Sequence, residues 1–67
     1  MQVNISLNDG FDLDRFSERL SEIGATVSQK LKFLNTLTAE IPDQRLQEVR
    51  AMEGVRSAEP DHQVHAV

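Results

Sequence analysis

The spacing of apolar residues constrains the fold of this chain most strongly, because it switches between two periods in a regular order. Apolar and polar residues alternate over residues 2–7, which predicts a strand with one buried face. Over residues 13–23 the apolar residues instead recur at steps of three and four, as on one face of a helix. Alternation returns over residues 26–34 and 37–41, with a turn at Asn35-Thr36 between them. These two segments are predicted to form a β-hairpin.

The second part of the chain repeats the change of period. Pro42 is compatible with the first turn of a helix, and apolar residues at steps of three over residues 46–52 predict that helix. Residues 55–59 predict a fourth strand. Gly24 and Gly54 follow the two predicted helices, where a left-handed residue commonly ends a helix. The order βαββαβ predicts an α+β, ferredoxin-like fold with a four-stranded antiparallel sheet, two helices on one face and an extended C-terminal tail.

Some side chains can be placed on this predicted frame. Asp12 is predicted to cap the first helix, and Phe11 to pack on Phe16 as a hydrophobic staple. The sheet face that the helices leave bare is predicted to be polar. Its predicted members are Gln2, Asn4, Ser6, Ser28, Lys30, Lys32, Thr38 and Glu40. On the same reasoning the buried side of the second strand is predicted to carry Val27, Leu31 and Phe33.

Length and composition favour one small domain, with residues 1–60 as the folded part and residues 61–67 as the tail. A chain of 67 residues buries only about 60% of its unfolded surface, and it has no cysteine to add a disulfide. Eleven acidic against seven basic residues give a net charge of −4, which disfavours a nucleic-acid partner. No export signal follows Met1, and no apolar run approaches the roughly 20 residues of a membrane span. We therefore expect a monomeric, cytoplasmic protein with no membrane partner.

Few residues could support enzymatic or metal chemistry. The only histidines, His62 and His65, lie with Asp61 in the predicted tail, so neither a metal site nor a serine–histidine–carboxylate triad is expected. Lys30 and Lys32 could form a Schiff base with a carbonyl substrate, but that chemistry requires a buried amine. We predict no catalytic residues, no metal and no cofactor.

The end of the chain has no core-building periodicity. Residues 59–67 read EPDHQVHAV. This segment resembles the C-terminal end of the propeptides of subtilisin-family serine proteases. The rest of the chain resembles the same propeptide and inhibitor family, which includes free-standing protease inhibitors. The resemblance extends from the first predicted strand to Val67, and it is densest at Gly54-Val55 and within residues 59–66.

The resemblance implies an inhibitor of subtilisin-type serine proteases that is not an enzyme. In this family the open sheet face packs on two parallel helices of the protease, and carboxylates near the end of the last strand cap those helices. Glu59 and Asp61 match these carboxylates. The tail that follows lies extended in the substrate cleft and pairs with the protease by strand addition.

The same resemblance implies a role for each of the last four side chains. They would occupy consecutive pockets in the order Val64, His65, Ala66 and Val67, the last in the primary specificity pocket. The terminal carboxylate would then lie near the protease nucleophile, like that of a bound product. Because no protease domain follows, the chain is expected to act in trans, as an inhibitor and as a folding helper.

Two other interpretations stay open on the sequence alone. A small regulatory or assembly module could use the same sheet face for a partner that is not a protease. A Schiff-base lyase, such as an aldolase, could use Lys30 or Lys32. Inhibition of subtilisin would favour the first interpretation, and borohydride trapping of a keto acid on a lysine would favour the lyase.

Overall fold

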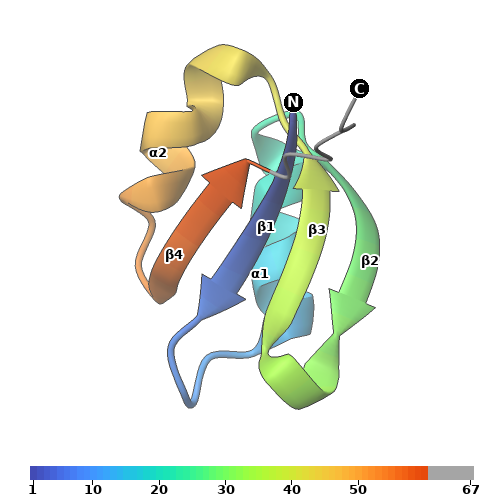
Figure 1. Cartoon of the computed structure of the whole chain (residues 1–67), viewed down its shortest axis with the longest axis vertical. Coiled ribbons are helices and arrows are strands. Elements are labelled where there is room, and N and C mark those ends of the chain that lie inside the picture. The colour runs from blue at the N-terminus through green and yellow to red at the C-terminus, as the bar shows by residue number, and fades with distance from the viewer. Residues whose placement is uncertain (61–67) are drawn as a thin grey trace, which may run out of the picture.

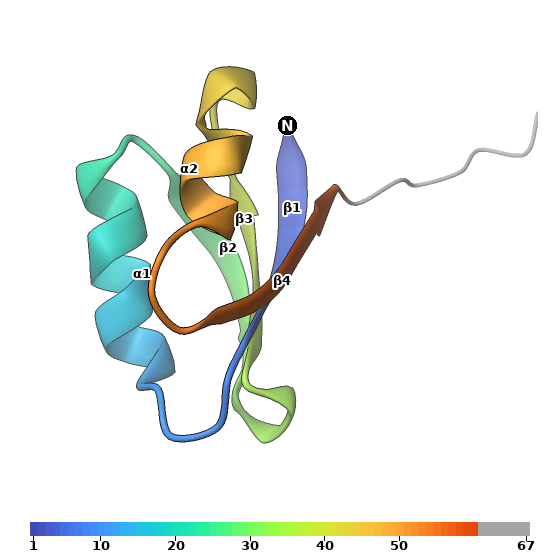
Figure 2. The ribbon, with the colours of Figure 1, turned by 90° about the vertical axis from the view of Figure 1, so that its left-hand side faces the viewer.

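The computed structural model describes residues 1–60, which form one four-stranded antiparallel sheet and two α-helices (Figure 1). In chain order the elements are β1 (Gln2–Leu7), α1 (Leu13–Glu22), β2 (Thr26–Leu31), β3 (Thr36–Glu40), α2 (Leu46–Arg50) and β4 (Val55–Pro60). The strands lie in the order β2-β3-β1-β4, and both helices cover one face of the sheet (Figure 2). This arrangement confirms the predicted α+β fold and its βαββαβ order. The predicted extended tail, residues 61–67, lies outside the described residues.

The hydrophobic core lies between the sheet and the two helices. The central strand β1 buries Val3, Ile5 and Leu7 almost completely, and they form one cluster with Phe16 and Leu20 of α1. The other members of this cluster are Leu13, Ala25, Leu37, Ala39, Ile41, Val49 and Ala58. Full burial of a large aliphatic side chain contributes about 1.5–3 kcal/mol. The inner face of the sheet therefore carries most of the stabilising contacts between the two layers.

The helix α1 begins and ends as its sequence predicts. The carboxylate of Asp12 accepts hydrogen bonds from the backbone N–H groups of Asp14, at 2.9 Å, and Arg15, at 3.5 Å, which confirms the predicted N-cap. At the other end, Gly24 has a φ of +87°, as predicted for the residue that ends the helix. The buried face between these ends therefore lies directly over the sheet.

The second strand is shorter than predicted. Strand β2 ends at Leu31, and residues Lys32–Leu34 form a 3₁₀ helix before β3 begins. Asn35 ends this turn with a φ of +50°, and its side-chain amide donates to the carbonyl of Asn8 at 2.9 Å. Asparagine tolerates this left-handed conformation better than most residues. The chain therefore leaves the strand early and reverses through a compact turn.

A register shift in β2 also reverses the predicted faces of its last residues. Between Val27 and Gln29 the pairing with β3 skips one residue, so that Lys30 lies opposite Leu37 and Leu31 opposite Thr36. An extra residue in one strand moves all later side chains to the other face. The prediction that Lys30 faces the bare side is therefore wrong, as is the prediction that Leu31 is buried.

The second helical segment starts as a 3₁₀ helix. Pro42 directly precedes Asp43–Arg45, and these three residues form the 3₁₀ helix. The regular helix α2 that follows has only five residues. Val49 is completely buried, while Leu46 and Met52 pack against the core from partly buried positions. The helix is therefore shorter than predicted: Leu46 and Val49 lie on it, and Met52 follows in the turn after it. Within residues 1–60, no helix has the length and apolar character that crossing a membrane requires.

Candidate interaction surface

The sheet face opposite the helices is bare of other described elements (Figure 2), and the side chains that the strand registers place on it are mostly polar. We call it the open face. From the strand registers, its members are Gln2, Asn4, Ser6, Thr26, Gln29, Leu31, Thr36, Thr38, Glu40, Ser57 and Glu59. The predicted polar character of this face is confirmed for β1 and β3. Its paired positions include two carboxylates and no basic side chain; Glu40 is ion-paired with the N-terminal ammonium of Met1 at 3.1 Å, and Arg56 is the unpaired residue at the register shift in β4.

Hydrogen bonds between neighbouring strands order the centre of the open face. The hydroxyl of Thr38 donates to the side-chain oxygen of Asn4 at 2.8 Å, and the hydroxyls of Ser6 and Thr36 are 3.3 Å apart. Thr38 is only 8% exposed, although it lies on this face. Paired short side chains lose little conformational entropy when a partner covers them. The centre of the face is therefore a flat and preorganised surface that suits a protein partner.

Glu59 lies on the open face near the end of β4. It is exposed and stands opposite Asn4 of β1. Its strand is supported from the helix layer, because Nε of Arg50 in α2 donates to the carbonyl of Ala58 at 3.0 Å. None of the ion pairs within residues 1–60 involves Glu59. Its carboxylate can therefore accept hydrogen bonds from an external group.

The turn between β2 and β3 exposes a small apolar cluster, which we call the hairpin tip. It consists of Leu31, Phe33 and Leu34, of which Leu31 is 37% exposed, Leu34 is 65% exposed and Phe33 is fully exposed. Phe33 was predicted on the buried side of a longer strand, and this prediction is wrong. An exposed phenylalanine adds nothing to the core, so this cluster is a candidate contact site.

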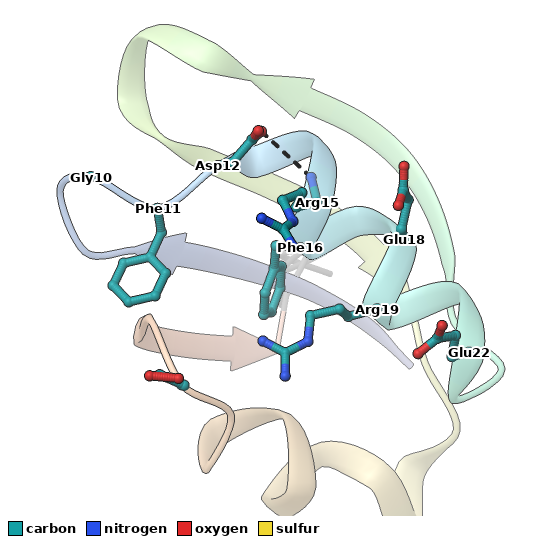
Figure 3. Close-up of a pocket in the computed structure, with 9 residues that line it drawn as sticks. Gly10, Phe11, Asp12, Arg15, Phe16, Glu18, Arg19 and Glu22 are labelled. Atoms are coloured by element: carbon teal, nitrogen blue, oxygen red, sulfur yellow. Dashed lines mark hydrogen bonds between the residues drawn. The ribbon is translucent and has the colours of Figure 1, made fainter.

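An open groove of about 640 Å³ runs along α1 on the helix side of the molecule (Figure 3). The rings of Phe11 and Phe16 line it, and Arg15 and Arg19 project from the helix beside them. Its acidic members are Asp12, Glu18, Glu22 and Glu53. The charged groups are all exposed and of both signs. Such a groove lacks the desolvated polar groups that orient a small-molecule substrate.

The two lysines considered for Schiff-base chemistry are both engaged on the helix side. Nζ of Lys30 and Nζ of Lys32 lie 3.0 Å and 3.3 Å from the carboxylate oxygens of Asp14 in α1. All three side chains are at least about one-third exposed. Imine formation requires a lysine in a buried pocket, and neither amine is buried. The prediction that Lys32 faces the bare side is also wrong, because β2 ends at Leu31 and Lys32 lies in the 3₁₀ helix, where it contacts Asp14.

The structure places only part of the predicted site. Glu59 is on the open face, whereas Asp61, Val64, His65, Ala66 and Val67 lie outside the described residues. His62 and His65, considered as metal ligands, also lie outside them. Within residues 1–60, no group of three or more histidine, cysteine or acidic side chains is arranged to hold a metal ion. Sequence reasoning missed the hairpin tip, for which the run Leu31, Phe33 and Leu34 next to Asn35 was the available signal.

The domain described above matches a known protein family. The family model described as "Putative peptidase inhibitor domain" matches residues 1–61. The matched segment includes every helix and strand, the open face, Glu59 and Asp61. No curated protein matches the chain.

Proposed function

Because the chain belongs to this family of peptidase inhibitor domains, we propose that it inhibits serine proteases of the subtilisin type. One observation supports the proposal: the matched domain has a bare polar sheet face with the exposed carboxylate of Glu59 near the end of its last strand, two residues before Asp61. Membership of the family supports a protease as the partner and a function by binding rather than by catalysis.

In this proposal the open face packs on two surface helices of the protease. Short side chains, including Ser6, Thr36 and Ser57, let a helix approach the sheet closely. Their hydroxyls can be satisfied within the sheet, as the Ser6–Thr36 contact at 3.3 Å illustrates. A face of this kind can be covered without leaving unpaired polar groups, which would cost about 1–3 kcal/mol each.

The carboxylates of Glu59 and Asp61 would cap the N-termini of those two helices. The first backbone N–H groups of a helix have no partner within it, and the helix dipole makes this end positive. Glu59 is suitable because it is exposed and makes no ion pair with the residues of the described domain. The two caps would set the register of the inhibitor on the protease.

Residues 61–67 would then run along the substrate cleft. We assign Val64, His65, Ala66 and Val67 to four consecutive pockets, with backbone pairing by strand addition. Val67 would occupy the primary pocket. The protease is blocked because its cleft is filled with a chain that it binds as it binds a product.

The test is competitive inhibition of subtilisin acting on a chromogenic peptide. The whole chain is expected to inhibit at sub-micromolar concentration and to raise the apparent KM without changing kcat. A variant that ends at residue 60 is expected to lose inhibition and to keep its thermal midpoint, because the core lies within residues 1–60. A control that keeps the full length but replaces residues 64–67 by glycine and serine separates pocket contacts from chain length.

Two results would contradict the proposal. Absence of inhibition by the whole chain would favour a regulatory module whose open face binds a partner other than a protease. Equal inhibition by the whole chain and by the variant ending at residue 60 would show that the tail does not enter the cleft.

A further inference from the structure

The hairpin tip lies at one end of the open face. Leu31 is opposite Thr36, whose hydroxyl contacts Ser6 on that face. Figure 2 shows the turn after β2 projecting from the sheet on the side away from the two helices. A partner that covers the open face would therefore contact Leu31, and the exposed Phe33 and Leu34 follow it in the turn at the same end of the sheet.

The turn that carries these side chains is fixed from the inside by several hydrogen bonds. The backbone N–H of Leu7 donates to the carbonyl of Asn35 at 2.9 Å, and the Asn35 side chain donates to Asn8 at 2.9 Å. The hydroxyl of Thr36 donates to the carbonyl of Leu34 at 2.9 Å. Lys32 is held towards α1 by Asp14. The apolar side chains are thus presented on an ordered support, which reduces the entropy lost on binding.

We propose that the hairpin tip is a second anchor of the inhibitor, which enters an apolar depression on the same protease that the open face covers. This inference rests on the proposed function and adds to it a contact remote from the tail and from Glu59. Phe33 is the central anchor, because a fully exposed aromatic ring gains the most from burial.

A second copy of this chain is a poorer occupant. The Phe33 ring can bury about 150–250 Å², whereas a stable interface requires roughly 800 Å² from each partner. Two copies could reach that area only by pairing their open faces. This would place the exposed Glu59 of both copies in one interface, and each chain carries a net charge of −4, so the two copies would repel each other.

The tip would also contribute to specificity among proteases. A protease with an apolar depression at this end of the inhibitor would bury Phe33, and one with charged groups there would be bound more weakly, because desolvating those groups without a partner is unfavourable. The tail would contact the substrate cleft of the protease, while the hairpin tip would contact a surface outside that cleft.

The experiment compares inhibition constants for four forms of the whole chain against the same subtilisin-type protease. These are the wild type, Phe33→Ser, Phe33→Leu and Gln44→Ser, the last at an exposed position outside the open face. Phe33→Ser is expected to weaken inhibition about tenfold to a hundredfold, as for loss of a buried phenylalanine. Phe33→Leu should retain most of the affinity, and Gln44→Ser should match the wild type. Thermal midpoints are expected to be equal, because Phe33 lies outside the core.

Each other outcome overturns the inference in a recognisable way. If the wild type inhibits and Phe33→Ser inhibits equally well, the tip is not a contact but the proposed function stands. If the wild type does not inhibit, the proposed function fails and the inference fails with it. If sedimentation shows a wild-type dimer that Phe33→Ser dissociates, the occupant of the tip is a second copy and not the protease.

Discussion

At the scale of single residues, Gly54 is constrained both by its own backbone conformation and by a side chain that is distant in the sequence. Its φ is +92°, a conformation that residues with a side chain adopt only with strain. A Cβ at this position would lie 2.5 Å from the ring of Phe11, which packs over the glycine from the loop before α1. Gly10 has a similar φ of +90° but no atom within 4 Å of a Cβ. Substitutions at the two glycines therefore separate the cost of backbone strain, which both positions share, from the cost of steric crowding, which only Gly54 has.

Gly54→Ala is expected to destabilise the protein more than Gly10→Ala. Both substitutions introduce left-handed strain of about 1–2 kcal/mol, and only the first also displaces the Phe11 ring. Urea unfolding would measure the two losses. In a Phe11→Ala background the excess loss at Gly54 should disappear, and an excess that persists would show that the ring does not constrain this position.

The sequence predicts the role of a residue correctly where that role depends only on neighbouring residues in the chain. Asp12 was identified as a cap because it precedes an apolar stripe, and its carboxylate makes the two expected hydrogen bonds. The alternation predicts a buried Phe33 wrongly, because the segment that contains it forms a 3₁₀ helix and not a strand. The exposure of Phe33 depends on the conformation of Asn35 two residues later and on the bond from Asn35 to Asn8, which is a tertiary contact.

At the scale of elements, the β-bulge in β2 limited what could be predicted. Sequence alternation assumes one residue per position on each strand, and between Val27 and Gln29 this assumption fails. The bulge sends Lys30 towards α1, where Asp14 binds it together with Lys32. A pattern of polar and apolar residues cannot locate such a bulge, because lysine is equally common on a solvated sheet face and in a surface ion pair.

This three-residue contact predicts a pH dependence for the packing of α1 on the hairpin. Hydrogen bonds from Lys30, and then from Lys32, hold the pKa of Asp14 below its usual range. The unfolded chain therefore takes up this proton before the folded chain does. The stabilising contribution is fully present above about pH 4, the usual aspartate pKa, and is lost as the pH falls through the lower folded-state pKa.

Asp14→Asn should reduce the amount by which the free energy of unfolding falls at acidic pH. Urea unfolding between about pH 2 and pH 7 is expected to show a smaller acid loss in Asp14→Asn than in the wild type, with the difference reduced by salt. In a background with Lys30→Gln and Lys32→Gln, Asp14→Asn should have little further effect. An unchanged acid slope in Asp14→Asn would show that other carboxylates account for it.

At the scale of the whole molecule, the topology was predictable because two hydrophobic periods alternate in an order that few folds accommodate. The same reasoning located the polar centre of the open face, since β1 and β3 are regular strands. The functional assignment cannot be derived from this hydrophobic pattern alone, because it also depends on a partner protein. Glu59 lies on the open face by its pairing with Asn4, while its proposed ligand belongs to another protein.

Charge is the property of the whole molecule that best tests this assignment. A net charge of −4 would favour any positively charged partner, wherever the acidic side chains lie. The proposed cap instead requires a carboxylate at the position of Glu59. Glu59→Gln and Glu22→Gln remove the same charge, the first from the open face and the second from the exposed side of α1. A comparison of the two variants therefore distinguishes a local contact of the Glu59 carboxylate from a general electrostatic attraction that depends only on net charge.

Glu59→Gln is expected to weaken inhibition about twofold to fivefold at low ionic strength, equivalent to about 0.3–1 kcal/mol for a charge at a helix N-terminus. Glu22→Gln should change the inhibition constant much less, because it lies on the opposite layer of the molecule from the open face. The difference between the two variants should narrow at about 1 M salt, where exposed charges are screened within a few ångströms. Equal effects of the two substitutions would mean that only net charge matters, and the open face would then lose its proposed cap.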